Sequence, residues 1–270
     1  MVTFPPCKIN LGLNVISKRA DGYHNILTCF YPVPWTDVLE VVPAKEFSFS
    51  LSGVPVPGVA AENLCVRAYR ILKEDHALEP VAMHLHKIIP LGAGLGGGSS
   101  DGSYALRTLN EIFNLSLSPE NLRTYAGRLG SDCAFFIENK PAIGTGKGDI
   151  LSDVALSLKG KYLVIVKPEI HISTAEAYSG ITPANPAVDL RAVLENHPMT
   201  EWKQLLRNDF EAVLFKKFPI IETLKQNLYT SGATYAGMSG SGAAVFGIFE
   251  NEVEIKNEFK NLSFWSGYLD

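Results

Sequence analysis

The sequence contains few cysteines and no surplus of basic charge. Its four cysteines, Cys7, Cys29, Cys65 and Cys133, are far apart and form no C-x-x-C pair. This pattern excludes a zinc ribbon and a redox dithiol, and it favours free, buried thiols. Lysine and arginine total 24 against 28 acidic residues, so the formal net charge is −4. A chain without a basic stripe is not expected to bind nucleic acid, because it cannot neutralise many phosphates.

Membrane and export signals are also missing. No apolar run in the sequence approaches the length of a membrane span. The first six residues contain no basic segment followed by an apolar one, so no signal peptide is predicted. We therefore expect a cytoplasmic protein without a membrane or nucleic-acid partner, present as a monomer or a homodimer. A hydrophobic content of 46% and a charged content of 19% are typical of a globular protein.

The periodicity of apolar residues predicts an α+β fold. Alternation predicts strands at 8–15, 26–33, 38–42, 47–51, 81–86, 162–166, 233–238 and 243–249. Helical spacing and capping residues predict helices at 62–75, after residue 98, from 119, and at 189–196, 209–217, 219–230 and 252–260. Strands and helices interleave without a strict βαβα rhythm, which favours α+β over a doubly wound sheet. We place a domain boundary between 1–155 and 156–270.

The most informative segment is a glycine-rich stretch at 90–101, which has five glycines in the seven residues 92–98. Glycine permits positive φ angles and close approach of a ligand to the backbone. The stretch joins a predicted strand to a predicted helix, whose first N–H groups and positive dipole end favour a phosphate chain. We therefore predict a nucleotide-binding loop. Its residues are Pro90, Leu91, Gly92, Ala93, Gly94, Leu95, Gly96, Gly97, Gly98, Ser99 and Ser100.

This loop differs from the commonest nucleotide-binding motifs. Gly92, Gly94 and Gly97 satisfy G-x-G-x-x-G, but the acidic residue at the expected distance, Glu111, falls within the predicted helix. A P-loop would end in G-K-[ST], whereas Gly98 is followed by two serines. The H-R-D and D-F-G motifs of protein kinases are missing from the sequence. The loop therefore belongs to another class of nucleotide-binding protein.

Three further segments contain polar residues suited to catalysis. Lys8 and Asn10 are two apart in a predicted strand and so share one face. Asp132 directly precedes the apolar run 133–136, which we predict to be a strand, and 237–242 is a second glycine-rich turn between two strands. Taken singly, Lys8 is more often a solvated lysine, Asp132 a helix terminator and the turn a hairpin. Together with the glycine loop, they indicate an active site.

In their order, the segments 6–11, 90–100 and 237–242 resemble the three motifs of the GHMP kinases, a family of small-molecule kinases. The segment R-A-D-G-Y-H at 19–24 makes the resemblance closest to members that act on a cytidyl diphosphate substrate in the non-mevalonate route to isoprenoid precursors. Similar short segments are present at 62–64 and 130–132. The chain departs from the family at Cys7, usually alanine, and at Asp101-Gly102, commonly Asn or Asp followed by Ala.

The resemblance implies a two-lobe fold, with an N-terminal lobe like the second domain of ribosomal protein S5 and a ferredoxin-like C-terminal lobe. It implies that ATP lies along the glycine loop, with Ser99 or Ser100 near the phosphates and Mg²⁺, and phosphorylates the 2-hydroxyl of the erythritol part of the substrate. Asp132 would accept or orient the hydroxyl proton, and Lys8 would lie between Asp132 and the γ-phosphate. Asn63 and Lys87 would lie near the adenine and ribose. The implied substrate-binding residues are Asn10, Tyr23, His24, Tyr178, Ser239 and Gly240.

Alternatives remain at several positions. Core packing accounts for Tyr178 almost as well as stacking on a base does. His84 and His86 share a strand face, but no third ligand is at hand, so we predict no metal site there. Another GHMP kinase, acting on mevalonate, homoserine or a sugar, is disfavoured by Tyr23 and His24. A nucleotide-binding regulator without catalytic activity is disfavoured by the presence of both Lys8 and Asp132.

Overall fold

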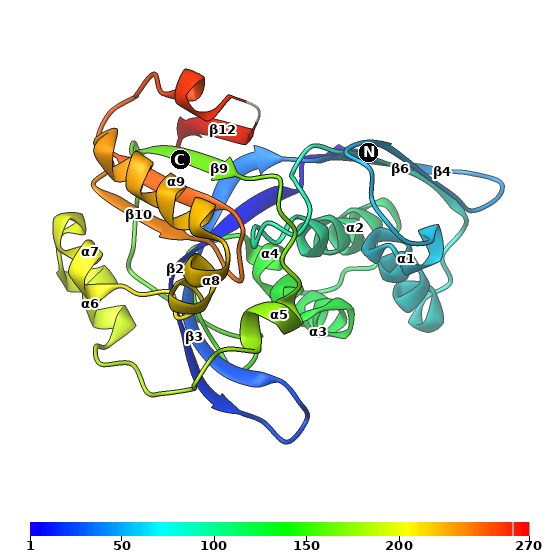
Figure 1. Ribbon diagram of the computed structural model, residues 1–270. Coiled ribbons are helices and arrows are strands. Elements are labelled where there is room, and N and C mark those ends of the chain that lie inside the picture. The colour runs from blue at the N-terminus through cyan, green and yellow to red at the C-terminus, as the bar shows by residue number, and fades with distance from the viewer. Residues whose placement is uncertain (261, 270) are drawn as a thin grey trace. The chain divides into compact units, whose positions relative to one another are not determined.

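The computed structural model describes residues 1–260 and 262–269. Helices and strands alternate irregularly along the chain, and the strands form three four-stranded sheets, so the predicted α+β class is confirmed (Figure 1). Contacts divide the chain into two compact units. The first unit contains residues 1–7, 35–91 and 96–140, and the second contains 8–34, 92–95 and everything from 141 onward. Each unit is thus built from three separate stretches of the chain. The expected boundary at 155 would instead divide the chain into two continuous parts.

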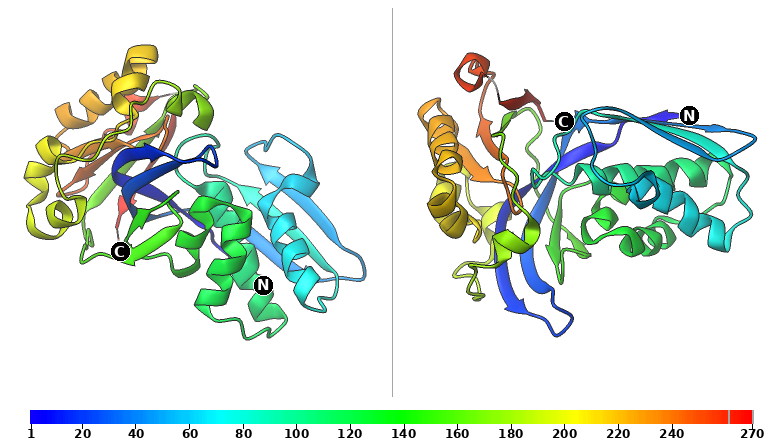
Figure 2. Two further views of the ribbon diagram at one scale, coloured as in Figure 1. Left: turned by 90° about the horizontal axis from the view of Figure 1, so that it is seen from below. Right: turned by 45° about the vertical axis from the view of Figure 1, so that its right-hand side comes forward.

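The first unit has one mixed sheet with strand order β1-β4-β6-β5. Its strands are β1 (Val2–Thr3), β4 (Val38–Pro43), β5 (Ser48–Gly53) and β6 (Val81–Lys87), and β5 pairs in parallel with β6. Its helices are α1 (Leu64–Asp75), α2 (Gly97–Ile112), α3 (Pro119–Leu129) and α4 (Phe135–Glu138), with 3₁₀ turns η1 (Ala60–Glu62) and η2 (Ser131–Ala134). The helices cover one face of the sheet (Figure 2). Alternate residues of β6, among them Met83 and Leu85, pack against them in the core.

The second unit has two sheets, with strand orders β2-β3-β7-β8 and β10-β11-β9-β12. The first consists of β2 (Pro6–Lys18), β3 (His24–Thr36), β7 (Ala142–Thr145) and β8 (Ile150–Asp153). The second consists of β9 (Tyr162–Lys167), β10 (Tyr235–Met238), β11 (Val245–Phe249) and β12 (Ser263–Tyr268). Its helical segments are α5 (Thr174–Tyr178), α6 (Leu190–Asn196), η3 (Met199–Glu201), α7 (Trp202–Leu205), α8 (Glu211–Lys217), α9 (Pro219–Thr230) and η4 (Lys256–Phe259).

Several predicted helix starts are confirmed by their caps. The Ser118 hydroxyl accepts a hydrogen bond from the Asn121 N–H, and Pro119 occupies the first helical turn of α3. Asp189 caps α6 in the same way, and Pro219 begins α9. Within the described part of the chain, no helix is long and apolar enough to cross a membrane.

Two secondary-structure predictions were wrong. The apolar run after Asp132 forms η2 and α4 instead of a strand, and Phe135 and Phe136 are buried there. A short apolar run cannot be assigned to a strand or a buried helix by periodicity alone. The charged helix expected at 252–260 is reduced to the turn η4, because that segment buries only Ile255 and Phe259 and has no continuous apolar stripe.

Gly102, which lowers the helix propensity of α2, permits close packing of α1 on α2. A Cβ atom at Gly102 would lie 2.8 Å from the Cβ of Leu64 at the start of α1. Real Cβ atoms do not approach one another so closely, so a larger residue would force the helices apart. The close approach of Leu64 therefore explains why this chain has glycine at 102, where the family commonly has alanine.

We expect Gly102→Ala to lower the free energy of unfolding by about 1–3 kcal/mol through overpacking, despite the better helix propensity of alanine. Gly127→Ala is the matched control, since a Cβ at Gly127 in α3 meets no other atom within 4 Å. This control should raise stability by up to about 1 kcal/mol. Urea denaturation of both variants measures the difference, and equal effects would contradict the packing argument.

Candidate active site

The second half of the glycine loop begins helix α2 as the sequence predicts. Gly96 is the N-cap residue, in the left-handed conformation with φ 71°. It has no side chain with which to cap the helix, and the Ser100 N–H already donates to the Gly96 carbonyl at 2.9 Å. The first N–H groups of a helix have no partner within the helix, which is the usual basis of an anion site.

The first half of the loop packs against the second glycine-rich turn, both within the second unit. A Cβ atom at Gly94 would lie 1.9 Å from the Ser239 carbonyl oxygen, so only glycine fits there. The Ser239 hydroxyl donates to the Gly94 carbonyl at 2.8 Å, and the Ala244 N–H donates to the Ala93 carbonyl at 3.1 Å. The structure thus brings together two motifs that are more than 140 residues apart in sequence.

Lys8 is a buried, fixed cation. Its Nζ donates to the Gly94 carbonyl at 2.8 Å and to Asn10 Oδ1 at 2.6 Å, and the residue is only 3% exposed. Asn10 is fixed in turn, since its Nδ2 donates to the Thr28 hydroxyl at 2.9 Å. The interpretation of Lys8 as a solvated strand lysine is therefore wrong, and the predicted shared face of Lys8 and Asn10 is confirmed.

Asn208 belongs to the same network, and the sequence analysis missed it. Its Nδ2 donates to the carbonyls of Met238 and Gly240, both at 2.8 Å, and its Oδ1 accepts from the Phe210 N–H at 3.1 Å. The adjacent Asp209 accepts a hydrogen bond from the Val15 N–H at 2.8 Å. These bonds tie the second glycine turn to strand β2. The only sequence signal was an Asn-Asp pair before a helix, which resembles an ordinary helix start.

Asp132 lies in η2 of the first unit, half-buried, whereas Lys8 lies in the second unit. The pairing of these two side chains remains a prediction. The next residue, Cys133, is buried, and its carbonyl accepts a hydrogen bond from the Ser103 hydroxyl at 2.7 Å. Burial raises the pKa of the Cys133 thiol to about 11, so the thiol stays protonated near neutral pH.

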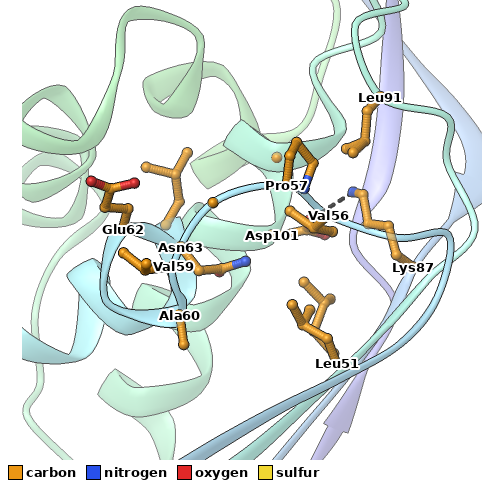
Figure 3. A pocket seen from close by; sticks show the side chains of 14 residues that line it. Leu51, Val56, Pro57, Val59, Ala60, Glu62, Asn63, Lys87, Leu91 and Asp101 are labelled. Atoms are coloured by element: carbon orange, nitrogen blue, oxygen red, sulfur yellow. Dashed lines mark hydrogen bonds and ion pairs between the residues drawn. The ribbon is translucent and has the colours of Figure 1, made fainter.

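A pocket of about 300 Å³ lies in the first unit beside the start of α2 (Figure 3). Its polar lining residues include Asn63, Lys87 and Asp101, and most of the others are apolar. Four of the predicted nucleotide-contacting residues, Asn63, Lys87, Leu91 and Gly98, line this one pocket. The remaining lining residues are Leu51, Val56, Pro57, Gly58, Val59, Ala60, Glu62, Leu64 and Leu85.

Lys87 is held between two buried carboxylates. Its Nζ forms ion pairs with Asp37 and, at 2.6 Å, with Asp101 Oδ2. Asp37 Oδ1 also accepts from the N–H groups of Ile88 and Ile89. Burial alone lowers the pKa of Lys87, but Asp101 and Asp37 outweigh it, so its pKa lies above the ordinary value. Burial also raises the pKa of Asp101 to about 7, opposed by Lys87 and reinforced by Asp37.

Two adjacent side chains at the start of α2 have buried polar atoms that are not hydrogen-bonded. Among the described residues, three buried side-chain oxygens lack a partner: Ser100 Oγ, Asp101 Oδ1 and Asn139 Oδ1. Leaving such groups unpaired costs roughly 1–3 kcal/mol each. Ser100 and Asp101 follow the glycine loop directly, which is the place where a ligand with polar groups would satisfy them.

An aromatic group in the second unit contains two of the predicted base-binding residues. The rings of His24 and Tyr178 stack with centroids 4.5 Å apart and planes 16° apart. Tyr178 also contacts the buried Phe210 edge-on, so it has both a stacking and a packing role. Tyr23 is 58% exposed, and the Lys147 ammonium lies 4.9 Å from its ring centroid. Lys147 is a second residue that the sequence analysis did not select.

His84 and His86 form a hydrogen-bonded cluster on the exposed sheet face. The Ser52 hydroxyl lies 2.8 Å from His84 Nε2 and 2.8 Å from His86 Nδ1. In residues 1–260 and 262–269, no group of three or more His, Cys, Asp or Glu side chains is arranged to hold a metal ion.

The comparisons with known proteins agree with this geometry. Residues 63–140 match the family model for the GHMP kinases N terminal domain, and 190–265 match that for the GHMP kinases C terminal. A 4-diphosphocytidyl-2-C-methyl-D-erythritol kinase of Cytophaga hutchinsonii is 50% identical over 259 residues, covering 96% of each chain. The enzyme of the same name from Parabacteroides distasonis is 46% identical over the whole of both chains. The chain belongs to the GHMP kinase family.

The fold of this GHMP kinase is also found in solved structures. A crystal structure of 4-(cytidine 5′-diphospho)-2C-methyl-D-erythritol kinase has a TM-score of 0.83 and 30% sequence identity, and the match covers 99% of this chain and 98% of the other. Both the α+β class and the two-part GHMP kinase fold expected from the sequence are therefore confirmed. As a GHMP kinase, the protein uses ATP as phosphoryl donor.

The raised pKa of Asp101 predicts a specific dependence of stability on pH. The folded protein keeps this carboxyl protonated up to about pH 7, whereas the unfolded chain loses the proton near pH 3.8. The stabilisation from this proton is thus complete below pH 3.8 and is lost as the pH rises to about 7 and above. Asp101→Asn removes the titration, because an amide stays neutral.

We expect the free energy of unfolding of the wild type, minus that of Asp101→Asn, to fall as the pH rises from 4 to 8. Urea titrations at intervals across this range measure the difference. If the free energies of unfolding of the two proteins change with pH in parallel, the Asp101 carboxyl of the folded protein is ionised throughout this pH range.

Proposed function

We propose that this kinase transfers the γ-phosphoryl group of ATP to the 2-hydroxyl of 4-diphosphocytidyl-2-C-methyl-D-erythritol, in the non-mevalonate route to isoprenoid precursors. The observation that carries the proposal is that one chain contains a GHMP kinase glycine loop at the start of α2 and a stacked His24–Tyr178 pair, next in sequence to the exposed Tyr23, that suits a cytosine. Relatives with this activity in their names, at 50% and 46% identity over nearly the whole chain, support it.

The ATP phosphates would lie against the glycine loop. A Cβ at Gly97 would lie 3.0 Å from Lys87 Nζ and 3.0 Å from an Ile89 methyl group, so the loop lies close against the end of β6. Phosphoryl transfer needs positioning and charge neutralisation more than covalent chemistry. Backbone N–H groups in such a loop supply both without a P-loop lysine.

Mg²⁺ would bind beside the phosphates. The buried, unpartnered Ser100 hydroxyl is the kind of hard oxygen ligand that Mg²⁺ takes alongside substrate phosphates, and Ser99 is adjacent. When bound, the ion would neutralise charge on the transferred phosphoryl group. These serines fit the ion, and the remaining positions of its octahedral shell would belong to phosphate oxygens and water.

Lys8 and Asp132 would carry out the transfer step. Two oxygen acceptors, the Gly94 carbonyl and Asn10 Oδ1, hold the Lys8 ammonium against the glycine loop. From there it would stabilise charge on the γ-phosphate. Asp132 would accept or orient the proton of the attacking hydroxyl. Asn10, Ser239 and Gly240 would contact the erythritol diphosphate part of the substrate.

The cytosine would be recognised by the aromatic group. Tyr23 exposes a ring face at the end of the R-A-D-G-Y-H turn, where the Arg19 and Asp21 side chains are joined by hydrogen bonds. Stacking of a base on an aromatic ring contributes about 1–3 kcal/mol. The His24 imidazole, stacked on Tyr178, would supply a polar edge for the base.

A substrate panel tests the proposal. ADP release from Mg-ATP is measured with 4-diphosphocytidyl-2-C-methyl-D-erythritol, mevalonate, phosphomevalonate, homoserine and galactose, each offered separately. We expect turnover with the cytidyl compound alone, and phosphorus NMR should locate the new phosphate on the 2-hydroxyl. Turnover with another alcohol would overturn the substrate assignment, and ATP binding without any turnover would favour a regulator.

Substitution of the two proposed catalytic residues gives a second test. We expect Lys8→Met and Asp132→Asn each to lower kcat by at least about a hundredfold while the Kd for ATP stays nearly unchanged, because both act on the transition state. Lys18→Met is the matched control, since Lys18 is exposed at the far end of the same strand, β2. Near wild-type turnover in either catalytic variant would refute its role.

A further inference from the structure

The backbone of Asn208 is fixed against strand β2, the strand that contains Lys8. The Leu13 N–H donates to the Arg207 carbonyl at 2.8 Å, and the Asp209 N–H donates to the Leu13 carbonyl at 2.9 Å. These two bonds place Asn208 beside Leu13 in a parallel bridge. The position of Asn208 relative to the strand is therefore set by the backbone alone.

The side chain of Asn208 is held in one orientation. The residue is 7% exposed, and its Oδ1 accepts a hydrogen bond from the Phe210 N–H at 3.1 Å. Its Nδ2 donates to the carbonyls of Met238 and Gly240, both at 2.8 Å. An amide nitrogen has two N–H groups, so each carbonyl receives one of them. A flipped amide would lose all three bonds.

The turn between these two carbonyls packs against both acceptors of the Lys8 ammonium. Those acceptors are the Gly94 carbonyl and Asn10 Oδ1. The Ser239 hydroxyl donates to the Gly94 carbonyl at 2.8 Å. A Cβ atom at Gly240 would lie 3.1 Å from the Gly94 oxygen and 3.3 Å from Asn10 Oδ1. A shift of this turn would therefore disturb the groups that hold Lys8.

These contacts form a closed ring within the second unit. Strand β2 carries Lys8 and also pairs with the segment that contains Asn208. Asn208 holds the turn around Ser239, and the turn meets the Gly94 carbonyl, to which Lys8 donates. A buried polar network whose members are all hydrogen-bonded is rigid, because no member moves without breaking a bond.

We propose that Asn208 is a positioning residue for phosphoryl transfer. Its amide holds the carbonyls on either side of Ser239 and so keeps the Lys8 ammonium where charge develops on the transferred phosphoryl group. The inference rests on the proposed catalytic role of Lys8. Misplacing a catalytic group by about 1 Å can lower a rate about a hundredfold, so a residue that acts only through others can affect kcat.

Asn208→Leu tests the inference, because leucine has nearly the shape of asparagine but forms no hydrogen bond with its side chain. The variant leaves two buried carbonyls unpaired, which favours a shift of the turn toward other partners. We expect kcat with Mg-ATP and the cytidyl substrate to fall about 10- to 100-fold. The Kd for Mg-ATP, measured by calorimetry, should stay close to the wild-type value, as expected for Lys8→Met.

Asn110→Leu is the matched control for an amide whose role is structural. Asn110 in α2 also joins two backbone groups: its Oδ1 accepts from the Leu117 N–H at 3.0 Å, and its Nδ2 donates to the Leu117 carbonyl at 3.4 Å. These bonds hold the loop after α2 in the first unit, apart from the ring around Lys8. The control should lower the free energy of unfolding but keep the wild-type kcat.

A double-mutant cycle shows whether Asn208 acts through Lys8. If it does, Asn208→Leu lowers kcat in the wild type but not in the Lys8→Met background, because the group that it positions is gone. Single-turnover measurements resolve the low rates of the Lys8 variants. Urea denaturation establishes that each variant is folded in the assay, and Asn208→Ser serves as a second variant where leucine prevents folding.

A folded Asn208→Leu variant with the wild-type kcat would overturn the inference. So would an equal loss of kcat in the wild-type and Lys8→Met backgrounds, since Asn208 would then act independently of Lys8. Both results leave the proposed reaction intact. A wild-type rate in Lys8→Met, or a wild type that does not turn over the cytidyl substrate, would instead refute the proposed function, and the inference with it.

Discussion

The carbonyl oxygen of Gly94 accepts hydrogen bonds from both Lys8 and Ser239, so this one atom joins residues from three sequence motifs within the second unit. It is possible only because Gly94 has no Cβ, which would otherwise overlap the Ser239 backbone. Asn208 extends the same network by holding the carbonyls on either side of Ser239. A lysine that is desolvated and fixed in this way does not have to move when negative charge develops nearby. Such preorganisation is the condition for electrostatic catalysis.

The first unit is organised around a different buried charge, the ammonium of Lys87. Removing one partner of a buried ion pair strongly destabilises the folded protein, whereas the intact pair adds little to its stability. Its presence beside a pocket is better explained by positioning than by stability. Lys87 and Asp37 leave one oxygen of Asp101 fixed, buried and unsatisfied, and a protein retains such an atom where a ligand completes its hydrogen bonding.

Much of the fold and part of the site could be predicted from the sequence. The helix that follows the glycine loop, the capped starts of α3 and α6 and the proline that begins α9 depend on local rules, and they were predicted correctly. The segment after Asp132 and the charged stretch near the C-terminus were predicted wrongly. Runs this short show no clear hydrophobic periodicity, so burial in the fold decides their secondary structure. The sequence analysis also did not select Asn208, which holds the second glycine turn, since an amide before a helix has an ordinary local explanation.

The sequence by itself determined the family, and it predicted which residues would carry its chemistry: a glycine loop for phosphates, a lysine and an aspartate for transfer, and aromatic residues for a base. Only the tertiary structure decided that Lys8 is buried against Gly94 and that Asp101 is left with an unsatisfied oxygen. The conformational freedom of glycine and the capping of helices depend on residues that are neighbours in the sequence, so both can be predicted from it. Desolvation and hydrogen-bond satisfaction depend on atoms brought together from distant segments, and these are specified only when the chain has folded.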